Sequence, residues 1–382
     1  MKFRFTDEQE MLRRAARAYA QKELGSAYLR ELDASGRAAH RELLPRMAAL
    51  GFTALRVPAA HGGLGGGVID AALLLEELGR SSLVAASILD CAIGFGSEAV
   101  RRLGSEAQQR EMFPKVVRGD LSFAVCLGEP DAGLDGPAMR TRAVADGDTF
   151  VIDGARILTA GARESGCLMV AARSEPLTPG RGDLSLFAVD PQSPGIRYRM
   201  LETLGMHGAG GFCELDFDAV RVPRSALLGA QGGAGAAVEA MTGQAGLFRA
   251  AYCIGCAQQA IDDALRYAGE RQQFGQAIGK FQAIAHLLVD LQVEADAARW
   301  LLYRAAWTAD AGAPCAGQTA MATLACSEAL LRVTSDAMRV YGGYGLTMEF
   351  DIQRHFRDAR LFVVADASSQ VRCDRIAHAM GL

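Results

Sequence analysis

Hydrophobic residues change their spacing twice along this 382-residue chain, and the two changes restrict the folds that it can adopt. Before residue 121 and after residue 229, apolar residues recur at the three- and four-residue intervals of amphipathic helices. From residue 121 to residue 222, short apolar runs such as 150–152 and 184–189 are separated by glycine and proline turns, a pattern typical of β-strands. The sequence therefore predicts an α+β multidomain protein made of three modules.

The three modules are expected as an N-terminal all-α domain at residues 1–120, a middle β domain at residues 121–229 and a C-terminal α-helical domain at residues 230–382. More than one domain agrees with the length, because a single hydrophobic core usually stops growing at roughly 250–300 residues. The β-type runs follow each other too closely for crossover helices, so we expect the middle domain to be an antiparallel barrel or sandwich.

Local signals indicate where several helices begin and end. Thr6 and Gln9 have the spacing of a capping box, so a helix is expected directly after Thr6. The apolar run 71–79 is expected to end at Gly79 as a C-cap. Long amphipathic helices are expected at residues 250–271, 281–310 and 319–340.

Charge and composition argue against several classes of protein. The formal net charge is −4, and lysine and arginine are spread along the chain instead of forming the basic stripe that nucleic acid requires. No apolar run reaches the roughly 18 residues of a membrane-spanning helix, and the first residues carry no apolar signal-peptide core. The 9 cysteines lack framework spacing, which is typical of reduced thiols. We expect a cytoplasmic protein that binds neither nucleic acid nor membrane.

Several common ligand-binding motifs are missing from the sequence. No segment matches G-x-G-x-x-G or a phosphate-binding P-loop, so a nucleotide bound by either motif is not expected. Cys253 and Cys256 form a C-x-x-C, but they lie in an apolar helical run without a second pair, which favours a packing role. The 6 histidines show no ligand spacing, so no metal site is expected.

Four segments carry polar or glycine residues that could build a site, and each also has a purely structural interpretation. The glycine-containing segment 128–133 could be a plain loop. Arg271 and Phe274 could be a helix-terminal cation and a core aromatic residue, and the segment 342–345 could end a helix. Asp366 could be a helix N-cap instead of a catalytic base.

Asp90 is the single acid in the apolar stretch 83–95. Burying a carboxylate without a partner costs several kcal/mol, so Asp90 must face a cavity or find a hydrogen-bond partner. A paired structural acid is the favoured interpretation, and a second candidate base is the alternative.

In their order and separations, these segments resemble signatures of the acyl-CoA dehydrogenase family. Further segments that resemble family signatures are residues 75–80, 220–223, 227–229, 270–275, 281–282 and 357–360. Together they span nearly the whole chain, and the α–β–α order agrees with that family. The resemblance implies an N-terminal helical domain, a middle β-barrel or sandwich and a C-terminal four-helix bundle.

The resemblance also implies FAD, held between the middle domain, the C-terminal helices and a neighbouring subunit of a homodimer or homotetramer. Arg271 and Phe274 would reach the adenine and pyrophosphate part of the flavin bound by a partner subunit. Gly342 and Gly343 would let the backbone approach the cofactor. The other positions that match cofactor contacts are Gln282, Arg339, Ser368, Gln370, Leu127, Gly128, Thr159 and Ala160.

The family reaction is the α,β-dehydrogenation of an acyl thioester carried by CoA or by a carrier protein. Asp366 falls where most of the family has a glutamate, so the resemblance implies that Asp366 abstracts the α-proton while the β-hydride passes to flavin N5. Asp90 is the second candidate for this base. The electrons would then pass to an electron-transfer flavoprotein or another acceptor.

The sequence departs from the family pattern close to the expected chemistry. Ala365-Asp366-Ala367-Ser368 replaces the usual tyrosine-glutamate-glycine-threonine, and a displacement of about 1 Å in a catalytic group can cost on the order of a hundredfold in rate. Ala160 replaces a flavin-contacting threonine, unless a shift of one residue restores the hydroxyl through Thr159.

Two other substitutions, Leu134 for serine and Arg339 for glutamine, also alter expected flavin contacts. The departures leave two alternatives open. One is a non-dehydrogenating flavoenzyme of the same superfamily, similar to nitroalkane oxidases or desulfinases. The other is a catalytically silent subunit of a hetero-oligomeric dehydrogenase.

Overall fold

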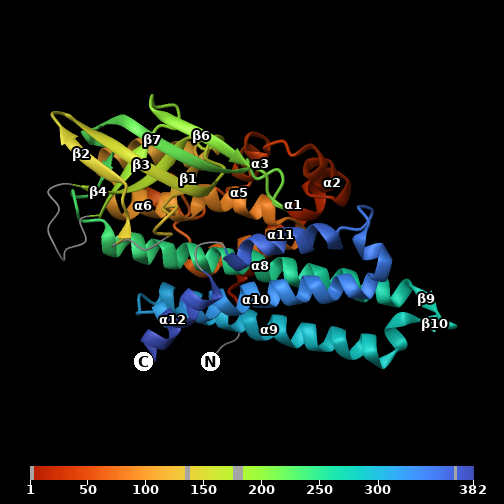
Figure 1. Ribbon diagram of the computed structural model, residues 1–382. Helices are drawn as coiled ribbons and strands as arrows, with labels where there is room; N and C mark the ends of the chain where they lie inside the picture. Colours follow the sequence, from red (N-terminus) through yellow and green to blue (C-terminus); the bar gives the residue numbers. More distant parts are fainter. Residues whose placement is uncertain (1–3, 134–137, 175–183, 365–367) are drawn as a thin grey trace.

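The computed structural model describes residues 4–133, 138–174, 184–364 and 368–382. Helices, then strands, then helices follow one another along the chain, so the expected α+β fold with a β region between two helical regions is confirmed (Figure 1). The residue boundaries at 120/121 and 229/230 stay a prediction.

The N-terminal region is helical, and its first helix begins as expected. Thr6 Oγ1 accepts a hydrogen bond from the Gln9 backbone N–H at 3.2 Å, and the Thr6 N–H donates to Gln9 Oε1 at 3.0 Å, which confirms the capping box. The helices are α1 (Asp7–Glu23), α2 (Ser26–Ser35), α3 (His40–Ala48), α4 (Val68–Ser81), α5 (Leu83–Ile93), α6 (Phe95–Leu103) and α7 (Glu106–Val117).

The stretch Leu83–Leu103 is long and apolar enough to cross a membrane by length and composition alone, but 83% of its most apolar window is buried inside the protein. The stretch is interrupted at Gly94, between α5 and α6, and a Cβ at this position would collide with Asp90. Residues of α5 therefore pack in the core shared with α8, whereas Phe95 and Ala99 of α6 pack beneath the sheet.

The middle region is an eight-stranded sheet with the strand order β6-β7-β3-β2-β4-β5-β8, and β1 pairs with β4 outside this path. Most neighbours are antiparallel, as expected, but β1–β4 and β2–β4 are parallel, so the sheet is mixed. A parallel pair needs a long connection, and the β2–β3 hairpin supplies it between β1 and β4. The strands are β1 (Phe123–Cys126), β2 (Arg142–Asp146), β3 (Thr149–Ala160), β4 (Cys167–Ser174), β5 (Leu184–Val189), β6 (Ile196–Leu201), β7 (Phe212–Pro223) and β8 (Leu227–Leu228).

Long helices form the C-terminal region, and a small hairpin protrudes from their outer end (Figure 1). The first helix begins at Gly235 and not near residue 250 as expected. Gly243 and Gly246 lower its intrinsic helix propensity, but both glycines face threonines of α10. The elements are α8 (Gly235–Glu270), β9 (Gln272–Gln273), β10 (Gln276–Ala277), α9 (Gln282–Asp310), α10 (Ala316–Tyr341), η5 (Gly342–Leu346), α11 (Ile352–Val364) and α12 (Ser369–Ala379).

Gly79 does not end a helix, which corrects the expectation from the sequence. It lies inside α4, which continues to Ser81. A Cβ at Gly79 would collide with the backbone carbonyl of Tyr252 on α8, so the glycine permits close approach of the two helices.

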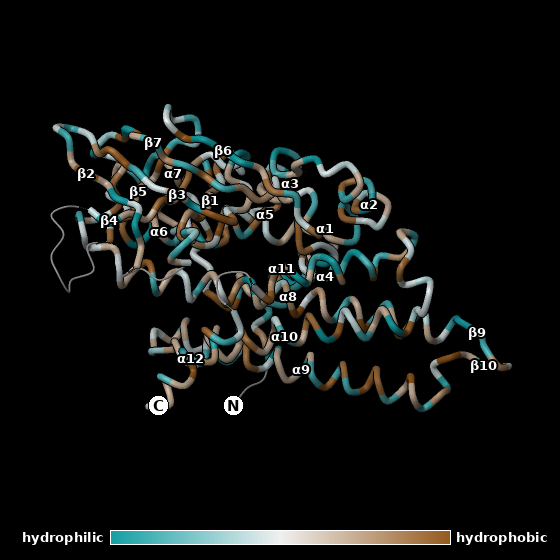
Figure 2. Tube along the Cα trace, in the orientation of Figure 1, coloured by the Kyte–Doolittle hydropathy of each residue, from teal (hydrophilic) through white to brown (hydrophobic). Residues whose placement is uncertain are grey.

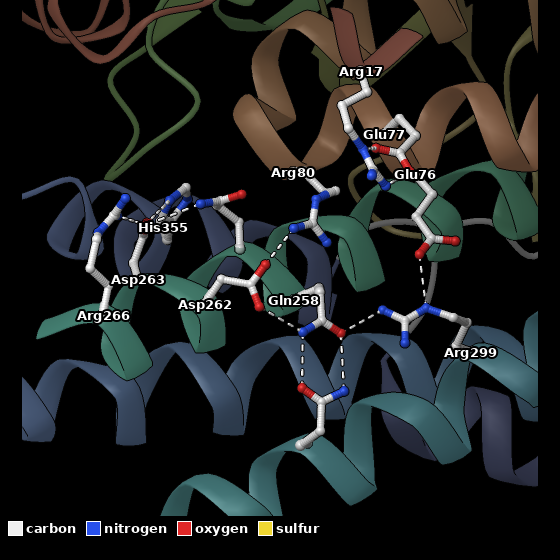
Figure 3. A network of polar contacts seen from close by, with 12 residues as sticks. Arg17, Glu76, Glu77, Arg80, Gln258, Asp262, Asp263, Arg266, Arg299 and His355 are labelled. Carbon is white, nitrogen blue, oxygen red and sulfur yellow. Dashed lines mark hydrogen bonds and ion pairs between the residues drawn. The ribbon is translucent and has the colours of Figure 1, made fainter. Parts of the chain in front are cut away.

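A polar network joins the N-terminal helices to the C-terminal ones (Figure 3). Glu76 on α4 accepts from Arg299 Nε at 2.8 Å and from the Tyr303 hydroxyl at 2.6 Å, both on α9. Glu77 accepts from Arg17 Nε of α1 at 2.9 Å. The two neighbouring carboxylates of α4 therefore connect α1 and α9 through the same helix.

Candidate functional site

A cavity of about 580 Å³ lies at the outer end of the C-terminal helices, where α8 and α10 end. Its lining includes four residues that the sequence assigned to cofactor binding, namely Arg271, Arg339, Gly342 and Gly343. The structure therefore brings two helix ends, about 70 residues apart along the chain, to one cavity.

The end of α10 explains why glycine stands at this cavity. Gly342 adopts φ +59° and ψ −137° as the C-cap of α10, a conformation that strongly favours glycine. No other atom lies within 4 Å of a Cβ built at Gly342 or Gly343, so the backbone is open to a ligand. The helix-ending interpretation of residues 342–345 is confirmed, and it is compatible with a binding role.

Aromatic rings and guanidinium groups form the walls of this cavity. Tyr267 and Tyr341 stack with ring centres 4.2 Å apart, and the Arg271 guanidinium lies 5.6 Å from the ring centre of Tyr344. Arg339 donates to Asp336 at 2.8 Å, and its side chain is 72% exposed. Guanidinium forks match phosphate oxygens, and flat rings suit a flat base. The donor set fits the adenine and diphosphate part of FAD.

Phe274 lies near this end of the molecule but does not line the cavity. It is 93% exposed, so its interpretation as a core aromatic residue is wrong. Its φ of +50° is uncommon for a residue with a side chain, and the strain is stored at the turn between β9 and β10. Gln282, the first residue of α9, is exposed and does not line the cavity either.

A second group of predicted cofactor residues belongs to the sheet region and does not line the outer cavity. Leu127 and Gly128 follow β1, and Thr159 and Ala160 end β3. The Ile157 backbone N–H donates to the Gly128 carbonyl at 3.0 Å, which brings the two pairs together.

Thr159 and Ala160 point to opposite faces of the sheet, as neighbours in a strand do. Thr159 is 2% exposed and lies against Cys126 in the interior. Ala160 is half-buried on the other face. Residue 160 is therefore the more accessible of the two from outside the sheet.

A third group lies on α12. Ser368 caps this helix by accepting from the Val371 N–H at 3.4 Å, and Gln370 is exposed. The Ser369 hydroxyl donates to Glu328 of α10. Glu328 and the end of α10 at Tyr341 are separated by about 20 Å of helix at 1.5 Å per residue. The α12 group and the outer cavity therefore lie far apart along the axis of α10.

Asp366 lies outside the described residues, as do Ala365, Ala367 and Leu134. The helices on either side of Asp366, α11 and α12, both contribute to a small cavity of about 10 Å³, with room for about one water molecule. This inner cavity is lined by Arg249, Ala250, Cys253, Thr323, Ser327, Phe362 and Arg372.

Arg249 and Arg372 bring two guanidinium groups to the inner cavity, and sequence reasoning singled out neither of them as a site residue. Arg372 is 4% exposed and donates to Ser327 Oγ at 2.8 Å. From the sequence, an arginine in a short polar helix is expected to be solvated. Arg372 is buried because α12 packs on α10.

Asp90 lies on α5 near Arg249. Burial, together with the Asp90 charge and against the opposing charge of Arg249, raises the pKa of the neighbouring Cys91 thiol to about 12. Asp90 and Arg249 therefore act on the same thiol. The role of Asp90 as second candidate base stays a prediction.

The cysteines and the other possible metal ligands form neither a disulfide nor a metal site within the described residues. All 9 cysteines are free, and burial raises the pKa of Cys253 and Cys256 on α8, which keeps both thiols protonated. Within the part of the chain that the structure describes, no group of three or more His, Cys, Asp or Glu side chains could hold a metal ion.

Comparison with known proteins settles the family. Models of the acyl-CoA dehydrogenase N-terminal, middle and C-terminal domains match residues 6–120, 124–220 and 231–381. The chain belongs to the acyl-CoA dehydrogenase family. Its helical, sheet and helical regions thus have counterparts in order along the family models.

Relatives within the family match almost the whole chain. Acryloyl-CoA reductase (NADH) of Anaerotignum propionicum is 33% identical over 97% of this chain and 94% of its own length. Subunit CarC of the caffeyl-CoA reductase–Etf complex of Acetobacterium woodii is 32% identical over 96% of this chain and 97% of its own length. The structure of butyryl-CoA dehydrogenase from Megasphaera elsdenii superposes with a TM-score of 0.94 at 29% identity, covering 100% of both chains.

Proposed function

We propose that this protein is an FAD-dependent oxidoreductase that removes two hydrogens from adjacent carbons of an acyl thioester. The observation that carries the proposal is the family match over residues 6–120, 124–220 and 231–381. The outer cavity supports it, because Arg271, Arg339, Gly342 and Gly343 offer a donor set for a dinucleotide.

In this proposal, Asp366 takes the proton from the α-carbon, and the pair of electrons left behind forms the carbon–carbon double bond. FAD, when bound, accepts the hydrogen that leaves the β-carbon as hydride. The Asp366 backbone N–H supports the thioester oxygen as negative charge develops on it. This role follows from the sequence position of Asp366 between α11 and α12, since the residue itself is not among those described.

We further propose that the protein works as a homo-oligomer, a dimer or a tetramer, in which each outer cavity completes the flavin site of a partner. Two features support this. The flavin candidates of the sheet, Leu127, Gly128, Thr159 and Ala160, do not line the outer cavity of the same chain. Apolar side chains also recur along α9 and remain exposed (Figure 2), namely Val289 at 58%, Val293 at 64%, Trp300 at 52% and Trp307 at 65%.

The electron acceptor in the proposal is an electron-transfer flavoprotein. Its support is the relative that forms part of a caffeyl-CoA reductase–Etf complex. The thioester is carried by CoA or by a carrier protein, and the cytoplasm is the proposed location.

A second candidate function is the reverse reaction, reduction of an α,β-unsaturated acyl thioester. The observation that favours it is that two of the three reported relatives are named as reductases. The same residues serve both directions, with the Asp366 carboxyl returning a proton to the α-carbon.

Anaerobic spectroscopy of the purified protein tests both candidates. Loss of the oxidised-flavin absorbance on addition of one member of a panel of saturated acyl thioesters supports dehydrogenation. Recovery of that absorbance when an unsaturated thioester is added to the prereduced protein supports reduction as the preferred direction. A protein that remains colourless after incubation with FAD contradicts both. Oxygen consumption with a nitroalkane, without any response to thioesters, would favour the nitroalkane-oxidase alternative.

A further inference from the structure

Arg156 is a fully buried arginine in the middle of the sheet, and it has no role in the proposed reaction. It lies on β3 with 0% of its side chain exposed, and its partner Glu129 has a side chain that is 4% exposed. Arg156 Nη1 donates to Glu129 Oε1 at 2.5 Å. A buried ion pair adds little net stability compared with apolar residues of the same size. Stability alone therefore does not explain why a charged arginine occupies this buried position.

The guanidinium of Arg156 links its own strand, β3, to β1, to Thr141 and to β4. Its Nε donates to the Cys126 carbonyl at the end of β1 at 2.8 Å, and its Nη1 donates to the Ala155 carbonyl at 2.8 Å. It also contacts the Thr141 hydroxyl and the Ala171 carbonyl on β4. Only the planar fork of arginine has enough fixed donors for this set, because a lysine ammonium has three donors on one atom.

Glu129 extends the connection into the loop after β1. Its two carboxylate oxygens accept from the backbone N–H groups of Thr141 at 2.8 Å and Arg140 at 2.7 Å. The Glu129 N–H and carbonyl pair with Gly133 at 2.8 and 2.9 Å, which closes the loop. Burial alone would raise the pKa of Glu129, but the hydrogen bonds from Thr141 and Arg140 and the charge of Arg156 lower it below its ordinary value. The carboxylate therefore stays ionised and holds the loop.

On the other side of Arg156, β3 leaves its regular pairing. The register of β3 against β7 shifts between Arg156 and Thr159. Inside this bulge, Leu158 has a φ of +51° and is 59% exposed. A leucine keeps such a conformation only where its surroundings enforce it. The Ile157 N–H bonds the Gly128 carbonyl at 3.0 Å, so the bulge and the loop are held against each other.

We propose that Arg156 is a positioning residue for the flavin: its guanidinium holds the loop at residues 127–133 against the bulge of β3 and thereby shapes the surface formed by Leu127, Gly128, Thr159 and Ala160. The inference rests on the proposed function, because it assumes that this surface receives FAD. Arg156 itself touches neither cofactor nor substrate. It acts through the backbone groups that it binds.

Arg156→Lys in the full-length protein tests the inference, because lysine keeps the charge and loses the fork. FAD is removed, the apoprotein is titrated with FAD, and the dissociation constant, the visible spectrum of the bound flavin and the urea midpoint of the apoprotein are measured. We expect FAD affinity to fall at least tenfold and the flavin spectrum to shift. The matched control is Arg299→Lys, which alters the ion pair with Glu76 in the helices. It is expected to lower the urea midpoint without changing FAD affinity or spectrum.

A second variant keeps the test decisive if Arg156→Lys fails to fold. Glu129→Gln preserves the shape of the side chain but removes its charge, and we expect an intermediate loss of FAD affinity of about threefold to tenfold. Wild-type affinity and spectrum in whichever of these variants folds would overturn the inference alone. A wild-type chain that takes up no FAD would overturn the proposed function, and the inference with it.

Discussion

The two cavities at the outer and inner ends of the C-terminal helices use arginine in opposite ways. At the outer end, Arg339 is 72% exposed on the wall of a cavity of about 580 Å³. At the inner end, Arg372 is 4% exposed beside a cavity of about 10 Å³. The outer end is open and presents unused hydrogen-bonding capacity to whatever enters, whereas the inner end is packed closed by the chain's own helices.

This contrast separates an end of the molecule that can bind a ligand from an end that stabilises the fold. Exposed guanidinium groups in water contribute little until an anion replaces their hydration, and salt weakens that attraction. A buried guanidinium must find its partners within the protein, because an unsatisfied buried donor is costly. The outer cavity is therefore expected to govern cofactor affinity, and the inner end is expected to govern local stability.

Asp366→Asn, a change at the proposed catalytic base, is expected to produce the largest effect. Removal of a general base typically costs a factor of 10² to 10⁴, so we expect roughly a thousandfold loss of thioester turnover with FAD still bound. Steady-state kinetics and the flavin spectrum measure the two effects. Asp374→Asn, an exposed acid on α12, is the control and should keep full turnover. Full turnover in Asp366→Asn would move the base to Asp90 or to another residue.

Arg271→Gln is expected to have the next largest effect, at the outer end. A charge-assisted hydrogen bond contributes about 1.5–3 kcal/mol, so FAD affinity should fall by roughly 10- to 100-fold. Equilibrium titration of the apoprotein with FAD measures the change. Arg304→Gln, an exposed arginine on α9, is the control and should bind FAD normally. Equal affinity of the two variants would mean that the outer cavity does not hold the cofactor.

Ser327 and Ser335 of α10 allow a direct comparison of burial, because each accepts a hydrogen bond from an arginine at 2.8 Å. Ser327 accepts from buried Arg372, and Ser335 accepts from half-buried Arg360. We expect Ser327→Ala to lower the free energy of unfolding by about 2 kcal/mol, because it removes an acceptor from a buried guanidinium, and Ser335→Ala to lower it by less than about 1 kcal/mol. Denaturant unfolding of the apoproteins measures both. The reverse order would show that the buried guanidinium does not depend on Ser327.

Ionic strength is expected to give the smallest effect, a severalfold change. Raising salt from about 0.01 M to about 1 M shortens the screening length from roughly 30 Å to roughly 3 Å. FAD affinity of the wild type should therefore decrease severalfold, and that of Arg271→Gln should decrease less. Fluorescence titration at several salt concentrations measures the slopes. Identical slopes would argue against a direct Arg271–phosphate contact.

The sequence predicted the parts of this molecule that depend on local pattern. Helical and alternating spacing gave the order of helices and strands, and the Thr6 capping box formed as expected. Such features can be read from the chain because they depend on spacing, capping and turn chemistry. The candidates Arg271, Arg339, Gly342 and Gly343 came instead from the resemblance to a family, and the structure shows that they line one cavity.

Features that depend on contacts between distant segments were not predicted. Gly79 looked like a helix end, because nothing in its own sequence shows that Tyr252 approaches it. The structural alternative for Phe274, a core aromatic residue, failed because exposure depends on how the β9–β10 hairpin projects, which the local sequence does not show. Arg156 and Arg372 looked like ordinary cations, because their burial arises from sheet pairing and from helix packing.

The length of α8 ties the outer and inner ends together. Its 36 residues form one continuous helix, with Arg249 and Cys253 at one cavity and Tyr267 at the other. Insertion of one residue between Cys253 and Tyr267 would rotate everything beyond it by about 100° and shift it by about 1.5 Å. The number of residues in α8 therefore fixes how the two cavities are oriented relative to each other. A substitution in this helix disturbs that arrangement less than an insertion or a deletion does.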